Sequence, residues 1–94
     1  MIFLRATKYE LNPEKMKGFV DYLYIFVSKS RLETQNLSFE FGLNSESEVI
    51  LVERWSSKSD YQAFIKKDEV KKELNVLEKM AYKTTELYAF DTIR

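Results

Sequence analysis

The sequence predicts one α+β domain of the ferredoxin-like kind, in which a βαββαβ chain forms an antiparallel sheet with its helices on one face. The first observation is length: 94 residues leave room for a single hydrophobic core. The second is that the spacing of apolar residues changes along the chain, from alternation typical of strands to the period of about 3.6 residues typical of helices. We therefore treat residues 1–94 as one domain.

The first strand and helix are predicted at the amino end. Residues 2–11, IFLRATKYEL, alternate imperfectly, which favours a strand. Asn12, Pro13 and Glu14 then predict a helix start, because Asn is a favoured N-cap, Pro fits the first helical position and an acid suits the positive end of the helix dipole. The helix is expected over residues 13–29. Its apolar residues recur on one face: Met16, Phe19, Val20, Leu23, Phe26 and Val27.

A hairpin should follow. From Asn36 the apolar residues alternate with polar or small ones, as in a strand with one buried face; they are Leu37, Phe39, Phe41 and Leu43. Residues 44–47, NSES, have the composition of a turn, and residues 48–55 form the returning strand.

The second helical region and the closing strand complete the order. Ser57 or Ser59 can cap a helix, and Asp68 can cap a further helical segment, so we expect a bend or break near residues 66–68. The apolar residues of the two segments have helical spacing: Tyr61, Phe64 and Ile65, then Val70, Leu74 and Leu77. Residues 82–93, YKTTELYAFDTI, are rich in Thr and aromatic residues and predict the last strand.

The second face of the sheet needs a cover. The strand over residues 48–55 is apolar on both sides, with Leu51 and Trp55 on one and Ile50 and Val52 on the other. Both helices lie on the same face, and an open face of an antiparallel sheet is normally polar. We therefore predict a homodimer that packs sheet to sheet.

Composition excludes several classes of function. Fifteen basic and fifteen acidic residues balance, which argues against nucleic acid or an anionic membrane as a partner. Cysteine is absent, and no apolar run approaches a signal peptide or a membrane span, so a cytoplasmic protein is expected. Histidine is also absent, which excludes a histidine-dependent triad, a Cys/His zinc site and histidine-ligated heme. No cofactor and no metal site are expected.

One stretch carries a resemblance. Residues 53–70, ERWSSKSDYQAFIKKDEV, resemble the signature of the antibiotic biosynthesis monooxygenase family, in which a strand ending in Glu-x-Trp leads through a short polar turn into a helix. With the βαββαβ order and the length, the resemblance extends over nearly the whole chain. It implies a dimeric α+β barrel. Members include cofactor-free oxygenases acting on hydroquinones or polycyclic phenols, heme-degrading relatives, and others with no known catalysis.

The resemblance implies catalytic roles for Trp55 and Tyr61, since some quinone-forming members have a Tyr six residues after this Trp. We expect Trp55, Tyr61 and Phe64 to line a flat pocket in which an aromatic substrate stacks, with Arg5 and Asn44 as polar substrate contacts at the sheet edge. The alternative is structural. Trp55 then closes the end of the core, its indole N–H finds a polar partner, a nearby base pairs with the acid of the motif, and Arg5 and Asn44 are solvated.

Departures from the family pattern leave two functions open. Phe64 stands where many quinol-oxidising relatives have His, Leu74 where heme-degrading relatives have His, and Leu51 where some phenol oxygenases have Asn; heme degradation is therefore disfavoured. The first hypothesis is a cofactor-independent monooxygenase that oxidises a small aromatic quinol or phenol with dioxygen. The second is a non-catalytic dimer of the same fold that binds a small hydrophobic ligand.

Overall fold

The computed structural model describes residues 1–93. The elements in chain order are β1 (Phe3–Glu10), the 3₁₀ turn η1 (Pro13–Lys15), α1 (Met16–Ser30), β2 (Asn36–Ser45), β3 (Glu48–Trp55), α2 (Lys58–Ile65), α3 (Asp68–Met80) and β4 (Lys83–Asp91). The predicted βαββαβ order is confirmed. The break between α2 and α3 falls at residues 66–67, where the sequence predicted it.

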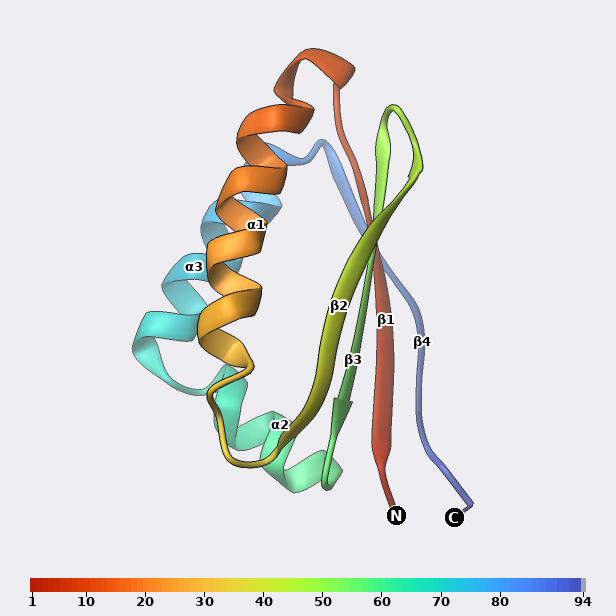
Figure 1. The fold of residues 1–94 in the computed structure, drawn as a ribbon, viewed down its shortest axis with the longest axis vertical. Coiled ribbons are helices and arrows are strands. Elements are labelled where there is room, and N and C mark those ends of the chain that lie inside the picture. Colours follow the sequence, from red (N-terminus) through yellow and green to blue (C-terminus); the bar gives the residue numbers. More distant parts are fainter. Residues whose placement is uncertain (94) are drawn as a thin grey trace.

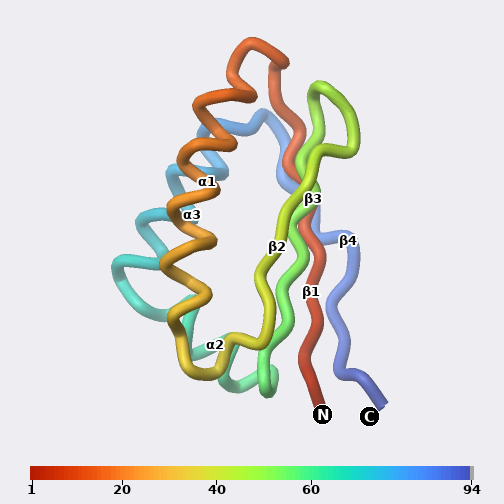
Figure 2. Tube along the Cα trace, in the orientation of Figure 1, coloured from red at the N-terminus to blue at the C-terminus, as the bar shows by residue number. Residues whose placement is uncertain are grey.

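All neighbouring strands are antiparallel, in the order β2-β3-β1-β4. The helices lie together on one face of the sheet, and β4 forms the edge farthest from α1 (Figures 1 and 2). The register places Phe3 opposite Trp55 and Arg5 opposite Glu53. Two segments that are about fifty residues apart in sequence thereby meet in the centre of the sheet.

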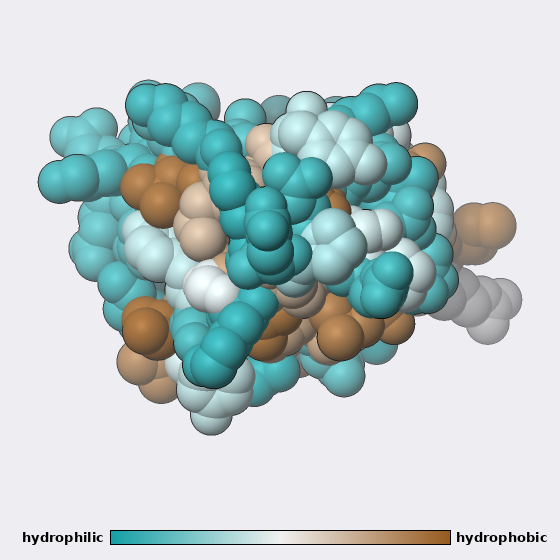
Figure 3. Space-filling view, turned by 90° about the horizontal axis from the view of Figure 1, so that it is seen from above, coloured by the Kyte–Doolittle hydropathy of each residue, from teal (hydrophilic) through white to brown (hydrophobic). Residues whose placement is uncertain are grey.

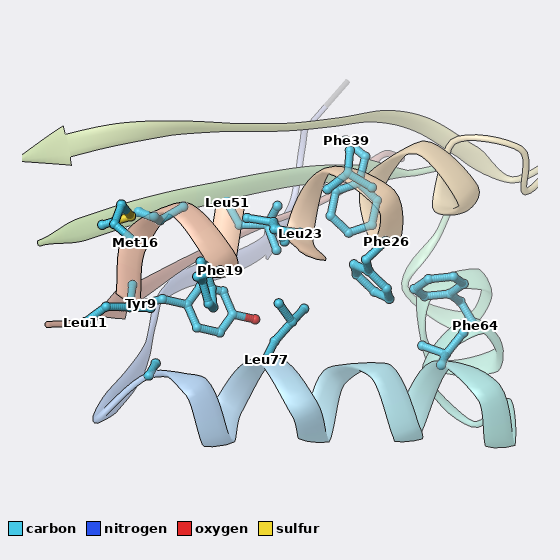
Figure 4. Packing of buried hydrophobic residues seen from close by; sticks show 14 of the residues in the cluster. Tyr9, Leu11, Met16, Phe19, Leu23, Phe26, Phe39, Leu51, Phe64 and Leu77 are labelled. Carbon is cyan, nitrogen blue, oxygen red and sulfur yellow. The ribbon is translucent and has the colours of Figure 1, made fainter. Parts of the chain in front are cut away.

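The core lies between the sheet and the helices. The predicted apolar stripe of α1 is confirmed, because Phe19, Leu23, Phe26 and Val27 are at most 1% exposed. Tyr9 reaches from β1 across the core towards Leu77 of α3 (Figure 4). Full burial of each such side chain stabilises the fold by about 1.5–3 kcal/mol, and this burial holds the helices on the sheet.

The start of the first helix differs from the prediction. Asn12 has extended backbone angles, but its side chain makes no capping hydrogen bond. Its carbonyl oxygen instead accepts from the backbone N–H of Lys15 at 2.9 Å, so the chain turns first as a 3₁₀ helix. The N–H of Lys15, which a side-chain cap would satisfy, is already bonded to this carbonyl, so the side-chain cap is dispensable here.

The cap predicted at Asp68 is also wrong. Asp68 is the first residue of α3, and the N-cap position is Lys67, which makes no side-chain capping bond. The short link to α2 explains the difference, because the backbone N–H of Lys67 is bonded to the carbonyl of Phe64 at 3.2 Å. Asp68 and Glu69 instead place negative charge in the first helical turn, where the dipole favours it.

The hairpin is confirmed, but its buried face is shorter than predicted. Phe39 is buried, whereas Leu37 and Leu43 are 52% and 61% exposed. The pairing of β2 with β3 is irregular around both residues, between Asn36 and Ser38 and between Leu43 and Ser45. A bulge interrupts strict alternation, so the apolar pattern did not predict which residues face the core. The strands also extend to Ser45, which leaves residues 46–47 as the turn.

The face of the sheet away from the helices carries a group of apolar side chains, with polar residues such as Lys8, Glu40 and Arg54 around them. Ile50 and Val52 are half-buried, and Tyr88 and Phe90 of β4 are 47% and 48% exposed. Seen from above, hydrophobic areas lie scattered among hydrophilic ones on the end of the molecule (Figure 3). Among residues 1–93, no helix is both long and apolar enough to cross a membrane.

Candidate functional site

The acid, the base and the tryptophan that the sequence singled out meet on one face of the sheet. Arg5 of β1 lies directly opposite Glu53 of β3, so the two side chains project to the same side. Trp55 follows Glu53 by two residues and therefore shares that side. It is the side covered by α2, since Trp55 packs on Phe64 and Arg5 lies over Tyr61.

Glu53 is a buried carboxylate with a donor for each oxygen. It is 2% exposed. Its Oε1 accepts from the indole N–H of Trp55 at 2.9 Å, and its Oε2 accepts from Nη1 of Arg5 at 3.2 Å. Burial raises the pKa of Glu53 above its ordinary value, although the Trp55 N–H and the Arg5 charge act in the opposite direction. Glu53 therefore holds the indole and the guanidinium in place by two charge-assisted bonds.

Arg5 connects this buried acid to the surface. Its Nε donates to Oε1 of Glu86 in β4 at 2.8 Å. The side chain of Arg5 is 22% exposed and that of Glu86 is 51% exposed. The guanidinium carbon also lies 5.4 Å from the ring centroid of Tyr61, within the range of a cation–π contact. One edge of the Arg5 cation is thus buried against Glu53 and another is bonded to the half-exposed Glu86 on the edge strand β4.

The aromatic residues fill the space that the sequence predicted as an open pocket. The ring centroid of Trp55 lies 4.6 Å from that of Phe64 and 6.3 Å from that of Tyr61. Phe3 covers the other side of Tyr61, at 5.2 Å. Trp55 is 1% exposed and Phe64 is 4% exposed. The structure brings Trp55, Tyr61 and Phe64 together as predicted but leaves no open flat pocket among them, because Trp55 packs on both other rings.

The polar turn after Trp55 fixes the start of α2. Ser57 is the N-cap, as the sequence allowed, and its Oγ accepts from the backbone N–H of Asp60 at 3.1 Å. The hydroxyls of Ser56 and Ser57 both donate to the Asp60 carboxylate, and these bonds lower the pKa of Asp60. The defined start sets the helical phase. It directs Tyr61 to Arg5 and Phe64 to Trp55.

Tyr61 is the least buried aromatic residue of the group. It is half-buried, and burial raises the pKa of its phenol above the ordinary value of 10.0 even though Arg5 acts to lower it. Tyr61 is therefore a neutral phenol near neutral pH. It can donate a hydrogen bond but does not serve as a base there.

Asn44 does not join these residues. It is exposed in β2 near the hairpin turn, and its Nδ2 donates to Oε1 of Glu48 at 2.8 Å. Glu48 and Glu53 are five residues apart in β3, about 17 Å along the strand. The structure therefore does not bring Asn44 to the group around Arg5. The composition of the hairpin did not show at which end of the sheet this side chain lies.

Phe64 also borders a surface cavity on its other side. This cavity has a volume of about 310 Å³ and lies between the end of α1 and the start of α3, where its lining includes Phe26, Ser30 and Val70. Trp55 and Tyr61 are not among its lining residues. Ion pairs occupy its rim, with Lys29 bonded to Glu73 at 3.0 Å. The cavity is therefore separate from the group around Arg5.

Two site residues were not singled out as such from the sequence. Glu53 belongs to the Glu-x-Trp signature but was considered only as a structural partner, and Glu86 was not considered. The register of β1 with β3 and with β4 was the missing information, because it makes Arg5 the neighbour of both acids. Among residues 1–93, no group of three or more acidic side chains is placed to hold a metal ion.

Comparison with known families identifies a match over most of the chain. The sequence profile described as antibiotic biosynthesis monooxygenase matches residues 1–73, which include β1, the hairpin, Arg5, the Glu-x-Trp motif and α2. No curated protein matches the sequence.

Solved structures show the same fold at low identity. A conserved protein from Methanosarcina mazei superposes with a TM-score of 0.86 at 16% identity, over 96% of this chain and 91% of its own. An antibiotic biosynthesis monooxygenase superposes with a TM-score of 0.85 at 12% identity, over 100% of both chains. SnoaB, a cofactor-independent oxygenase from Streptomyces nogalater, superposes with a TM-score of 0.82 at 5% identity, over 99% of this chain and 94% of its own.

Proposed function

The chain belongs to the antibiotic biosynthesis monooxygenase family, and we propose that it is a cofactor-independent monooxygenase that oxidises a small aromatic quinol or phenol with dioxygen. The observation that carries the proposal is the contact of Arg5 with Tyr61, 5.4 Å from guanidinium carbon to ring centroid. A fixed cation beside a neutral phenol donor is suited to a substrate that must react as its anion. The likeness to SnoaB, itself a cofactor-independent oxygenase, supports this class of reaction.

Each residue of the group has a proposed role. Tyr61 donates a hydrogen bond to the substrate oxygen, and the positive charge of Arg5 lowers the cost of ionising that oxygen. Trp55 and Phe64 pack behind Tyr61 and help to fix the position of its ring. Glu53 holds both the indole and the guanidinium through its two bonds of 2.9 and 3.2 Å. Asn44 has no role in this site.

The chemistry needs only the substrate and dioxygen. A phenolate transfers one electron to dioxygen, which gives a phenoxyl radical and superoxide. The two combine at a ring carbon that carries hydrogen, ortho or para to the oxygen, and form a C–O bond to a peroxide that takes up a proton. Loss of the ring hydrogen and cleavage of the O–O bond release water and leave a second carbonyl. One oxygen atom enters the quinone and the other leaves as water, so atoms and electrons balance.

We propose that the enzyme acts as a homodimer whose sheets pack face to face. The support is the apolar group on the outer face, where Val52 lies opposite Ala6 of β1, Ile50 follows in the same strand, and the large side chains Tyr88 and Phe90 of β4 are about half exposed. Large exposed apolar faces commonly mark protein interfaces. A second copy of the sheet would remove these side chains from water and cover β4.

Oxygen uptake tests the proposed reaction. Purified protein is mixed with a panel of simple hydroquinones and phenolic polycycles in the presence of a metal chelator, and the rate is compared with autoxidation of each compound alone. We expect uptake above the blank that is insensitive to the chelator, with a quinone product containing one oxygen atom from ¹⁸O₂. Equal rates with and without protein over the whole panel would count against the proposal.

A second function is favoured by the packing of Trp55. Its indole is 1% exposed and its N–H is already bonded to Glu53, as expected for a tryptophan that closes a core. On this reading the chain is a non-catalytic dimer that binds a small hydrophobic ligand. Calorimetric binding of the same aromatic compounds without any oxygen uptake would favour this second function over the first.

A further inference from the structure

A groove runs between α1 and α3, which pack side by side in the helical layer (Figure 1). Two cavities of about 510 and 300 Å³ lie along it, and Val76 lines both of them. Neither cavity is lined by Arg5, Trp55 or Tyr61. Lining residues recur with helical spacing on each helix, which makes the groove continuous; they are Gly18, Tyr22 and Ile25 on α1 and Lys72, Val76 and Met80 on α3.

The floor of the groove is apolar and reaches solvent. Val76 and Met80 are half-buried, and Ile25 is 58% exposed. The core-facing residues Leu23 and Leu77 lie on other faces of the same helices and are fully buried. The groove has the volume of a small-molecule site. An apolar ligand that lies in it would remove these side chains from water, which favours binding.

Gly18 leaves the floor open at one end of the groove. It is exposed and lies inside a helical stretch that begins with η1 and continues through α1. Glycine is less stable than alanine in a helix interior. A Cβ atom at this position would meet Cε of Met80 at 3.9 Å, an ordinary contact. Packing within this chain therefore does not require glycine here, and the missing side chain leaves room for a ligand beside Met80.

Positive charge is available at the same end. Lys15 and Lys79 line the 510 Å³ cavity and are exposed. Among residues 1–93, neither of them takes part in an ion pair. Glu14 is the one acid among the described residues that line this cavity. Two unpaired cations against one acid, beside an apolar floor, are complementary to an anion that carries an apolar chain.

The other end of the groove offers no such charge. Lys29 lines the 300 Å³ cavity, but its ammonium is held by Glu69 at 3.4 Å and by Glu73 at 3.0 Å. The charges of the groove are therefore asymmetric. An anionic head is favoured near Gly18, and the apolar part of the ligand is favoured towards Ile25.

We propose that the groove between α1 and α3 binds a medium-chain carboxylate. The carboxylate lies at Lys15 and Lys79, and the alkyl chain passes over Gly18 and Val76 towards Ile25. Gly18 and Ile25 are about 10 Å apart along the helix axis, a length that an extended chain of medium length can follow. The site is separate from the group around Arg5 and remains exposed when two sheets pack face to face. It goes beyond both functions considered above.

An NMR titration of the ¹⁵N-labelled protein tests the inference, because it reports both affinity and location. The probes are octanoate and 1-octanol, which have chains of the same length and differ in the charge of the head. Both are used below the concentrations at which they self-associate. We expect the amide signals of Val76 and its neighbours in α3 to shift, and octanoate to bind about fivefold more tightly than 1-octanol.

A double variant tests the two lysines. Lys15→Gln combined with Lys79→Gln should weaken octanoate binding about fivefold and leave 1-octanol binding within about twofold. The matched control is Lys58→Gln combined with Lys71→Gln, which changes the net charge equally at two exposed lysines that line neither cavity. It should keep the preference for octanoate. Loss of the preference in both double variants would mean that overall charge decides, and would overturn the role of Lys15 and Lys79.

Gly18→Leu tests the groove itself. Leucine should fill the floor and weaken binding of both probes roughly tenfold or more. It is a better helix former than glycine, so the thermal unfolding midpoint of the variant should not fall. Unchanged binding in a folded variant, equal binding of the two probes to wild type, or no shifts along α3 would each overturn the proposal. If the variant unfolds, the lysine variants decide. None of these readouts depends on oxygen uptake, so the proposed reaction stands or falls separately.

Discussion

The indole N–H of Trp55 donates to Oε1 of Glu53 at 2.9 Å, although the two residues are only two positions apart in the same strand. The bond is possible because alternate residues of a strand share a face. This hydrogen bond explains why an acid precedes the tryptophan at the end of β3. The acid satisfies the indole of a fully buried ring and, with its other oxygen, holds Arg5.

Glu53 makes the stability of the protein depend on pH. Burial raises its pKa in the folded state above the ordinary value of 4.5. The folded state therefore binds the proton of the Glu53 carboxyl more tightly than the unfolded state does. The stability that this proton contributes is present below about pH 4.5 and is lost as pH rises through the raised pKa. We expect the free energy of unfolding of wild type, relative to Glu53→Gln, to fall from pH 4.5 towards neutrality. Denaturant titrations at several pH values would check this, and a difference that is constant or rises would contradict it.

The Arg5–Glu53 pair should be strongly coupled. Arg5→Met leaves the carboxylate of Glu53 buried without its counter-ion, which we expect to cost about 3 kcal/mol, the low end for a buried pair because Arg5 is partly exposed. Adding Glu53→Gln should recover about 1 kcal/mol or more. The control is Lys17→Met, which breaks an exposed pair with Asp21 and should cost under about 0.5 kcal/mol. Additive effects at Arg5 and Glu53 would show that the bond contributes no coupling.

Tyr61→Phe should reduce turnover of a confirmed substrate without reducing stability. The variant keeps the ring that packs on Phe3 and Trp55 and loses the phenol that donates to the substrate anion. A hydrogen bond to a charged group is worth about 1.5–3 kcal/mol, so we expect kcat to fall about 10- to 100-fold. Oxygen uptake at saturating substrate is the measurement. An unchanged rate would remove Tyr61 from the mechanism.

Ser57→Ala should destabilise the start of α2. Its Oγ accepts from the Asp60 backbone N–H at 3.1 Å and its hydroxyl donates to the Asp60 carboxylate. Loss of an N-cap costs about 1 kcal/mol, and the position of Tyr61 should become less defined. The matched control is the exposed Ser59→Ala in the first turn, which should change the unfolding midpoint little. Equal midpoints for the two variants would argue against the capping role.

Val52→Glu tests the proposed dimer. Val52 lies on the outer face of the central strand β3, opposite Ala6 and Glu40, and a charge there would be buried between two sheets at high cost. We expect sedimentation to show a dimer for wild type and a monomer for the variant. Tyr24→Glu, on the exposed surface of α1 at 63% exposure, should remain a dimer. A wild type at monomer mass at micromolar concentration would rule out the dimer.

Several features were predictable because they depend on neighbours in sequence. The apolar stripe of α1, the Ser57 cap and the break between α2 and α3 follow from side-chain spacing and cap chemistry within a few residues. The predictions that differ from the structure concern features that depend on how distant segments pair and pack. Leu37 and Leu43 are exposed because β2 pairs irregularly with β3. Asn44 is remote from Arg5 because the hairpin turn lies at the other end of the sheet.

The sequence by itself determined the order of the elements and the membership of Trp55 and Tyr61 in one signature, since both are encoded within short stretches. Only the tertiary structure decided that Arg5 meets Glu53 and that the aromatic rings fill the space of the expected pocket. The physical reason is that register and close packing depend on the shapes of segments brought together from across the chain. Those contacts exist only once the sheet and helices are assembled.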